Sequence, residues 1–255
     1  MPPHAASPVL CYLICASQRS GTTLLHRALT DTGIAGRPDE YFLAVDEVAQ
    51  PEWAFSWEHG PFAAAHGVAD RPAYLELVYR LGTTPNGVFG AKLMWNNLPW
   101  AIAKFQEMPR FSGLSRAEVF HEAFPNLRAI HVTRRDRIAQ AVSWARMAQD
   151  GVSVVSEDEP ARPSGEPRYD PELIGNLEGL IREGEQGWRT FFDELGLTPL
   201  ELVYEDFVFE ARWEPTIRSV LSHLELDADA VPIPRPRTNR QADALNADWI
   251  ARFTA

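Results

Sequence analysis

The segment from Val9 to Gly33 constrains the fold of this 255-residue chain more than any other part. It opens with an apolar run of strand-forming residues, VLCYLICA, and a polar loop follows directly. A helical pattern then begins, with leucines and alanine at helix spacing as far as residue 29. The first N–H groups of a helix lack intrahelical partners and bind anions. We therefore expect a strand, a tight loop and a helix that together form an anion site.

The polar loop, SQRSGTT, carries the groups that such a site needs. Gly21 allows close approach of the backbone to a ligand. Ser20, Thr22 and Thr23 add hydroxyl donors, and Arg19 supplies a positive charge. The loop is not a Walker A loop, because that motif needs a second glycine and a lysine before the hydroxyl residue.

Composition limits the kind of protein. The chain is long enough for one large α/β domain, and no internal repeat or long linker divides it, so we expect a single domain over residues 1–255. The net charge of −11 disfavours binding to nucleic acid or to an anionic membrane. An anionic ligand must therefore be held by local positive charge.

The two cysteines and the N-terminal residues bear on the compartment. On one strand, Cys11 and Cys15 would lie about 13 Å apart at roughly 3.3 Å per residue, too far for a disulfide. Two buried thiols fit a reducing cytoplasm. No Lys or Arg precedes the first apolar run, so we expect no signal peptide. No stretch approaches the about 20 apolar residues of a membrane helix, so we expect none.

The histidines bear on metal binding. The seven histidines show no metal-ligand spacing, so we expect no metal.

The rest of the chain alternates between strand-like and helix-like patterns. This alternation predicts an α/β fold with a parallel sheet flanked by helices. A proline-rich stretch of mixed charge, about residues 153–170, is expected to be a mobile loop. The expected strands are 9–16, 88–95 and 127–133, and the expected helices include 71–81, 140–149 and 171–195.

Three features, taken in chain order, resemble sulfotransferases. The polar loop is similar to their 5′-phosphosulfate loop, which binds 3′-phosphoadenosine 5′-phosphosulfate (PAPS) without a metal. Arg135 and Ser143 lie eight residues apart after a strand, the spacing with which these enzymes hold the 3′-phosphate of the nucleotide. The segment LELVYED resembles their late strand ending in Tyr-Glu-Asp. The resemblance implies a P-loop-like sulfotransferase fold with PAPS as cofactor.

The resemblance is closest to the bacterial trehalose 2-sulfotransferase family. It implies sulfuryl transfer to a hydroxyl of a carbohydrate or glycosylated metabolite, with a trehalose-like disaccharide as one acceptor. It also implies a homodimer, to which the aromatic-rich residues 41–62 could contribute an interface. The segments that carry the resemblance, between residues 17 and 245, are SQRSGTTLL, GIAGRPDEYF, TPNGVFGAKLMWNN, RRDRIAQAVSWARM and NRQADAL.

The same resemblance suggests the catalytic groups. Arg19 stands where the wider superfamily has a catalytic Lys, so it is expected to stabilise the leaving group. That superfamily takes its base from a His two residues after a Lys, whereas here Lys92 is followed at that place by Met94. In the trehalose family a Glu of the G-x-P-x-E-[FY]-F segment serves as base, and it matches Glu40. The neighbouring Asp39 is the alternative.

The acceptor and the far end of the nucleotide have further candidates. The chain departs from the trehalose enzyme at two places: Arg37 stands where that enzyme has an acidic residue, and the loop between Phe42 and Trp53 is shorter. Because Arg37 is positively charged, an acidic or phosphorylated acceptor is an alternative. Arg240, in NRQADAL, is a further candidate for the nucleotide. The residues that the resemblance places against the acceptor are Gln18, Arg37, Pro38, Asp39, Glu40, Tyr41, Phe42 and Trp53.

Two other functions compete with sulfuryl transfer. A kinase-like, nucleotide-dependent phosphotransferase would need Mg²⁺ and normally a P-loop Lys, which the loop does not provide. A non-catalytic nucleotide-binding protein would keep the fold without activity.

Overall fold

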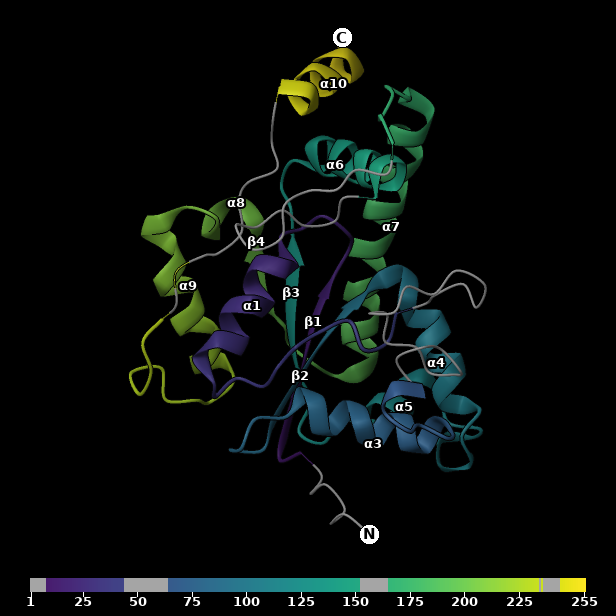
Figure 1. Ribbon diagram of the computed structural model, residues 1–255, viewed down its shortest axis with the longest axis vertical. Helices are drawn as coiled ribbons and strands as arrows, with labels where there is room; N and C mark the ends of the chain where they lie inside the picture. Colours follow the sequence, from purple (N-terminus) through teal and green to yellow (C-terminus); the bar gives the residue numbers. More distant parts are fainter. Residues whose placement is uncertain (1–7, 44–63, 152–164, 234, 236–243) are drawn as a thin grey trace.

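A computed structural model describes residues 8–43, 64–151, 165–233, 235 and 244–255 (Figure 1). The strands are β1 (Leu10–Ala16), β2 (Val88–Met94), β3 (Arg128–Thr133) and β4 (Leu200–Val203). The α-helices are α1 (Thr22–Thr32), α3 (Arg71–Gly82), α4 (Leu98–Gln106), α5 (Arg116–Ala123), α6 (Arg137–Asp150), α7 (Pro171–Leu195), α8 (Tyr204–Phe207), α9 (Glu210–His223) and α10 (Ala244–Thr254). Short 3₁₀ turns occur at η1 (Trp95–Asn97) and η2 (Pro109–Phe111).

The strands of the described chain form one parallel sheet in the order β2-β1-β3-β4. At the end of β1, Ala16 pairs with Met94 of β2 and with Val132 of β3. The carboxyl ends of these strands therefore lie along one edge, which is where open α/β sheets bind their ligands. The predicted α/β fold with a parallel sheet flanked by helices is confirmed.

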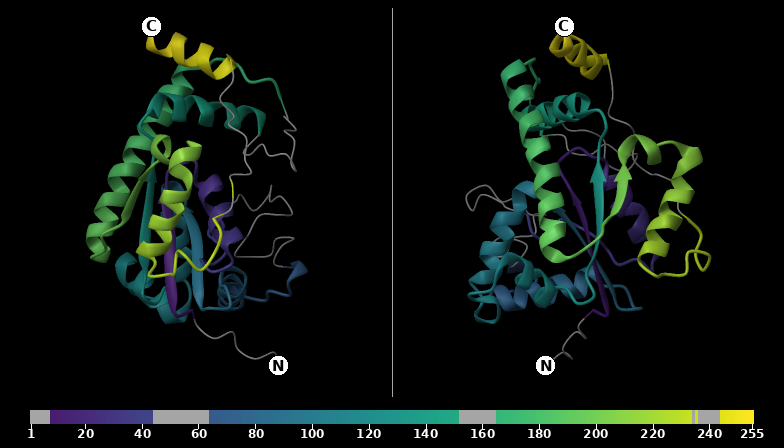
Figure 2. Two further views of the ribbon diagram at one scale, coloured as in Figure 1. Left: turned by 90° about the vertical axis from the view of Figure 1, so that its left-hand side faces the viewer. Right: turned by 180° about the vertical axis from the view of Figure 1, so that it is seen from behind.

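The strand β1 contributes to two separate cores because successive side chains of a strand point to opposite faces. Cys11, Leu13 and Cys15 belong to a core with residues of α3, α4, α5 and α7. Tyr12 and Ile14 belong to a second core with residues of α1 and α9. The edge-on view in Figure 2 shows α7 and α1 on opposite sides of the strands. The sheet is thus covered on both faces, as its continuous apolar strands require.

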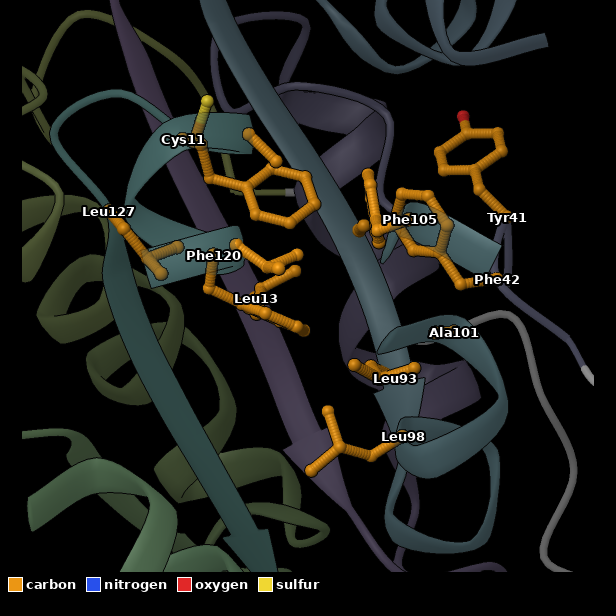
Figure 3. Close-up of a cluster of buried hydrophobic side chains, with 14 of the residues drawn as sticks. Cys11, Leu13, Tyr41, Phe42, Leu93, Leu98, Ala101, Phe105, Phe120 and Leu127 are labelled. Carbon is orange, nitrogen blue, oxygen red and sulfur yellow. The ribbon is translucent and has the colours of Figure 1, made fainter. Parts of the chain in front are cut away.

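The first of these cores is dense in aromatic rings, and Figure 3 shows part of it around Leu13 and Phe105. Cys11 and Cys15 are both free and buried there, as the strand geometry predicts. Burial raises the pKa of the Cys11 thiol to about 12, and that of Cys15 also rises well above its usual value. Both thiols are therefore protonated and inert at neutral pH.

Helix α7 packs closely against the start of the polar loop. The indole Nε1 of Trp188 donates a hydrogen bond of 3.0 Å to the carbonyl oxygen of Ala16, the last residue of β1. A Cβ atom at Gly187 would overlap the ring of Trp95, and one at Gly184 would overlap the Ser17 hydroxyl. The two glycines thus let the helix approach the edge of the sheet where ligands are expected.

Most of the predicted element boundaries agree with the structure, and one is wrong. The helix expected over residues 171–195 is α7, with Asp170 as its N-cap and Gly196 as its left-handed C-cap. The late strand was expected to end in Tyr-Glu-Asp, but β4 ends at Val203 and Tyr204 opens α8. Of the expected mobile loop, residues 152–164 lie outside the described part. No helix of the described residues is long and apolar enough to cross a membrane.

Candidate active site

The polar loop joins β1 to α1 at the carboxyl edge of the sheet, as the sequence predicts. Gly21 has a φ of +86°, in the region that favours glycine, and a Cβ atom there would overlap the ring of Tyr204. Arg19 has a φ of +64°, which is uncommon for a residue with a side chain. Such conformations persist where the surrounding structure enforces them, often at functional sites.

The loop is held in shape by its own residues and by α6. The buried hydroxyl of Ser20 donates a hydrogen bond of 2.9 Å to the carbonyl oxygen of Ser17. From α6, Gln140 Nε2 donates to the carbonyl oxygen of Gln18 at 2.7 Å. The half-buried side chain of Gln18 donates to Asn96 Oδ1. These bonds fix the loop around the N-terminus of α1, where Thr22 and Thr23 begin the helix.

Arg19 reaches from the loop across to α6. Its Nε donates a hydrogen bond of 3.0 Å to Ser143 Oγ, and its Nη1 lies 3.8 Å from Met147 Sδ. Burial, followed by the positive charge of Arg134, lowers the pKa of Arg19 to about 10, so the guanidinium remains charged at neutral pH. A bound anion would relieve this repulsion between like charges.

Arg134, directly after β3, is a member of this cluster that the sequence spacing did not single out. Its Nη1 donates to the carbonyl oxygen of Arg19 at 3.5 Å, and its guanidinium carbon lies over the Tyr204 ring, 5.0 Å from the ring centroid. Only 15% of its side chain is exposed. The sequence indicated a phosphate-binding arginine here by two adjacent arginines, Arg134 and Arg135. The eight-residue spacing to Ser143 selected Arg135 and passed over Arg134.

That second arginine, Arg135, has different neighbours. Its Nη2 lies 2.8 and 2.9 Å from the carboxylate oxygens of Asp206, and 62% of its side chain is exposed. The hydrogen bond with Asp206 raises the pKa of Arg135. Glu205 accepts hydrogen bonds from the backbone N–H groups of Arg135 and Asp136 at 2.9 and 3.2 Å. Ser143, the expected partner of Arg135, bonds to Arg19 instead.

Glu40, the predicted base, forms an ion pair with a buried lysine. Lys92 Nζ lies 2.8 Å from Glu40 Oε1, with 6% of the lysine side chain and 30% of the glutamate side chain exposed. The carboxylate of the alternative base, Asp39, accepts a hydrogen bond of 2.7 Å from the backbone N–H of Glu40. Burial raises the pKa of Asp39. The two neighbouring carboxylates therefore have distinct surroundings.

The remaining acceptor candidates divide between the surface and the core. Arg37 is exposed and Pro38 is buried. Tyr41 and Phe42 are 3% and 1% exposed, and Figure 3 shows their rings beside the aromatic core. Tyr41 donates its hydroxyl hydrogen to the carbonyl oxygen of Arg37 at 2.7 Å, so both rings anchor the segment that carries Glu40. Trp53 and Arg240 lie outside the described residues.

The described residues contain no group of three His, Cys, Asp or Glu side chains placed to hold a metal ion. The structure brings together a cationic loop at the carboxyl edge and, after α1, the carboxylate of Glu40, which a lysine on the neighbouring strand β2 holds. Such a set of groups can hold an anionic donor and accept a proton from an acceptor.

Comparison with known proteins identifies the family. Residues 11–255 match the Stf0 sulphotransferase family. The chain is 32% identical to the trehalose 2-sulfotransferase of Mycolicibacterium smegmatis over 95% of its own length and 93% of that protein. It is 31% identical to the enzyme of the same name from Mycobacterium tuberculosis, over 96% and 94% of the two chains. A crystal structure of a sulfotransferase from Alicyclobacillus acidocaldarius shares the fold, with a TM-score of 0.51, 16% identity, and coverage of 98% of this chain and 92% of that one. The chain therefore belongs to the Stf0 family of sulfotransferases.

Proposed function

We propose that this sulfotransferase transfers the sulfuryl group of PAPS to a hydroxyl of a carbohydrate or glycosylated metabolite, with a trehalose-like disaccharide as a candidate acceptor. The observation that carries the proposal is the hydrogen bond between Arg19 and Ser143, which joins the polar loop to α6 beside the N-terminus of α1. The two relatives named trehalose 2-sulfotransferase support the choice of a sugar. Family membership favours sulfuryl transfer over a kinase-like reaction or a non-catalytic protein.

The donor groups of the loop fit a polyanionic nucleotide. Arg19 and Arg134 bring two guanidinium groups together in a chain whose net charge is −11. Ser20, Gly21, Thr22 and Thr23 surround the N-terminus of α1, where N–H groups favour negative charge. When bound, PAPS supplies the sulfuryl group and leaves as 3′,5′-ADP.

The 3′-phosphate is assigned to Arg135 and Ser143, with Arg240 as a further candidate. Arg135 is exposed enough to meet a ligand, although its present partner is Asp206. A phosphate would have to share this guanidinium with the Asp206 carboxylate or displace it. Arg134 is the alternative, since it lies beside Arg19.

The protein groups divide the work of an in-line displacement. Glu40 accepts the proton of the acceptor hydroxyl while the acceptor oxygen forms its bond to sulfur. Arg19 stabilises the negative charge that grows on the bridging oxygen as the bond from sulfur to the 5′-phosphate breaks. Lys92 holds the Glu40 carboxylate in place. Gln18 and the segment from Arg37 to Phe42, together with Trp53, are assigned to the acceptor.

Two measurements test this function. Thermal unfolding with 3′,5′-ADP in the presence of EDTA should show stabilisation, by about 2.7 kcal/mol at 100 times the dissociation constant. Transfer of labelled sulfate from PAPS should then be measured with trehalose, other neutral disaccharides and phosphorylated sugars. Equal binding of 5′-AMP, or loss of binding with EDTA, would contradict the cofactor assignment. A preference for phosphorylated sugars would move the acceptor to the class that the exposed Arg37 favours.

We further propose that the chain is a single domain that acts as a homodimer in the cytoplasm. The support is its resemblance to the trehalose 2-sulfotransferase family. Light scattering on the purified protein tests the assembly, and a monomer at micromolar concentration would count against it.

A further inference from the structure

The segment that carries Glu40 is fastened to β2 on one side. The backbone N–H of Lys92 donates a hydrogen bond of 2.9 Å to the carbonyl oxygen of Asp39. The side chain of the same lysine pairs with the Glu40 carboxylate at 2.8 Å. Lys92 is aligned with Ile14 of β1, whose side chain belongs to the core beneath α1. The lysine and the carboxylate therefore lie on the α1 side of the sheet.

A second attachment of this segment comes from α1 itself. His26 Nδ1 lies 2.7 Å from the carbonyl oxygen of Pro38. Because a carbonyl oxygen only accepts hydrogen bonds, Nδ1 carries the proton. Burial, followed by the charge of Lys92, lowers the pKa of His26 to about 3, so the ring is neutral and keeps this tautomer at neutral pH.

The position of His26 in its helix relates the two halves of the site. It is the fifth residue of α1, four residues after Thr22 at the helix N-terminus. At about 1.5 Å per residue, this places it roughly 6 Å along the axis from the end that faces the anion site. An in-line transfer needs an acceptor oxygen about 3 Å from the sulfur and about 3 Å from the base. These two distances add up to about 6 Å, which is close to the distance along α1 between Thr22 and His26.

We propose that His26 is a positioning residue, whose hydrogen bond to Pro38 sets the Glu40 carboxylate at the right distance from the donor loop. The inference rests on the proposed role of Glu40 as the base. His26 touches neither donor nor acceptor in this proposal, and it acts only through the backbone that carries the carboxylate. Its loss should therefore slow the chemical step and leave binding of the nucleotide intact.

The test uses substitutions that differ in the donor they offer. His26→Leu removes the N–H, and we expect kcat to fall about 10- to 100-fold, the effect of a small misplacement, with the Kd for 3′,5′-ADP changed by less than about 2-fold. His26→Asn keeps an N–H near the position of Nδ1 and should recover most of kcat. His26→Gln offers its amide farther from Cα and should recover less. If His26→Leu does not fold, the kcat values of His26→Asn and His26→Gln still test the role of His26, and equal values for the two would contradict it.

A matched control comes from α9. His223 Nε2 lies 3.1 Å from the carbonyl oxygen of Ala129, so this ring also bonds to a backbone carbonyl. Ala129 is on β3, which β1 separates from the strand of Lys92, and it lies three residues before Val132, the partner of the last residue of β1. His223→Leu should lower the melting temperature and leave kcat unchanged. An equal loss of kcat in the two leucine variants would overturn the inference, because it would trace the effect to stability.

The double variant separates this inference from the proposed function. If His26 acts through Glu40, then adding His26→Leu to Glu40→Gln should cost less than about 2-fold more in kcat. Fully additive losses would overturn the positioning role and leave Glu40 as the base. A fully active Glu40→Gln enzyme would instead refute the proposed base, and the role of His26 would fail with it.

Discussion

Lys92 Nζ lies 2.8 Å from Glu40 Oε1, and the lysine is almost completely buried on β2. The ion pair joins the central sheet to the segment that follows α1, and it fixes one oxygen of the carboxylate. Two residues farther along β2, where the wider superfamily has its histidine base, the chain has the buried apolar Met94. Because Met94 cannot act as a base, Glu40, which is held beside β2, is the carboxylate that takes this role in the proposed mechanism.

Glu40→Gln is expected to reduce sulfate transfer by about 10²- to 10⁴-fold, because the amide cannot accept the proton of the acceptor. Affinity for 3′,5′-ADP should be nearly unchanged, since the variant keeps the size of the side chain. Steady-state transfer and calorimetric titration measure the two quantities. Asp39→Asn is the control and should retain most activity; a fully active Glu40→Gln enzyme would shift the role to Asp39 or to no side chain.

Lys92→Met should separate activity from stability. Methionine fills the buried path of the lysine side chain without its charge, and the remaining Glu40 carboxylate is 30% exposed and can be solvated. We therefore expect a melting temperature equal to or above that of the wild type, as for other buried ions replaced by apolar residues. Transfer should fall at least about 10-fold because the carboxylate loses its fixed position. A large loss of stability with normal kcat would contradict this role for Lys92.

Nucleotide affinity should respond in opposite directions at Arg135 and its partner. Arg135→Gln and Ser143→Ala should weaken 3′,5′-ADP more than 5′-AMP, since only the former has the 3′-phosphate. Asp206→Asn should strengthen 3′,5′-ADP, because the carboxylate and the phosphate compete for one guanidinium. Arg19→Ala should weaken both nucleotides and also slow transfer. If Arg134→Gln alone removes the preference for 3′,5′-ADP, the 3′-phosphate belongs to Arg134.

Two glycines of α7 provide a matched pair for stability. Gly187→Ala places a Cβ atom within the ring of Trp95, and we expect a loss of about 1–3 kcal/mol in the free energy of unfolding. Gly179→Ala, in the same helix, meets nothing within 4 Å and should gain about 0.4–1 kcal/mol. Urea denaturation of both variants measures the difference. Equal stabilities would mean that α7 can move away from Trp95 at little cost.

The raised pKa of Asp39 predicts a stability that depends on pH. Burial favours the neutral acid in the folded state, so the ionised carboxylate destabilises the fold above its folded pKa. Asp39→Asn keeps an acceptor for the Glu40 N–H and should be more stable than the wild type at pH 7. This difference in stability should shrink as the pH falls through the folded pKa and vanish below about 3.8, where the unfolded state is protonated too. Denaturation curves at several pH values check this, and an advantage independent of pH would contradict it.

Much of the fold could be predicted because it depends on neighbouring residues. The strand from Leu10 to Ala16, the turn at Gly21 and the long helix α7 follow from apolar spacing, glycine and capping residues within a few positions of one another. The prediction that the late strand continues through Tyr-Glu-Asp was wrong, because α8 begins at Tyr204. A run as short as LELVY does not distinguish a strand from a helical turn.

The site was only partly determined by the sequence. The sequence by itself supplied the loop with Arg19, the motif with Glu40 and the spacing of Arg135 and Ser143. Only the tertiary structure decided which of these side chains meet: Ser143 bonds to Arg19, and Arg135 to Asp206.

The partners of the Glu40 segment were decided in the same way. Lys92 and His26 belong to elements that the sequence leaves unplaced relative to each other, and both meet this segment in the fold. The physical reason is that such contacts depend on strand order, on register and on the face to which each strand turns its side chains. These are set by the packing of residues far apart in the chain, whereas local propensity acts only over a few residues.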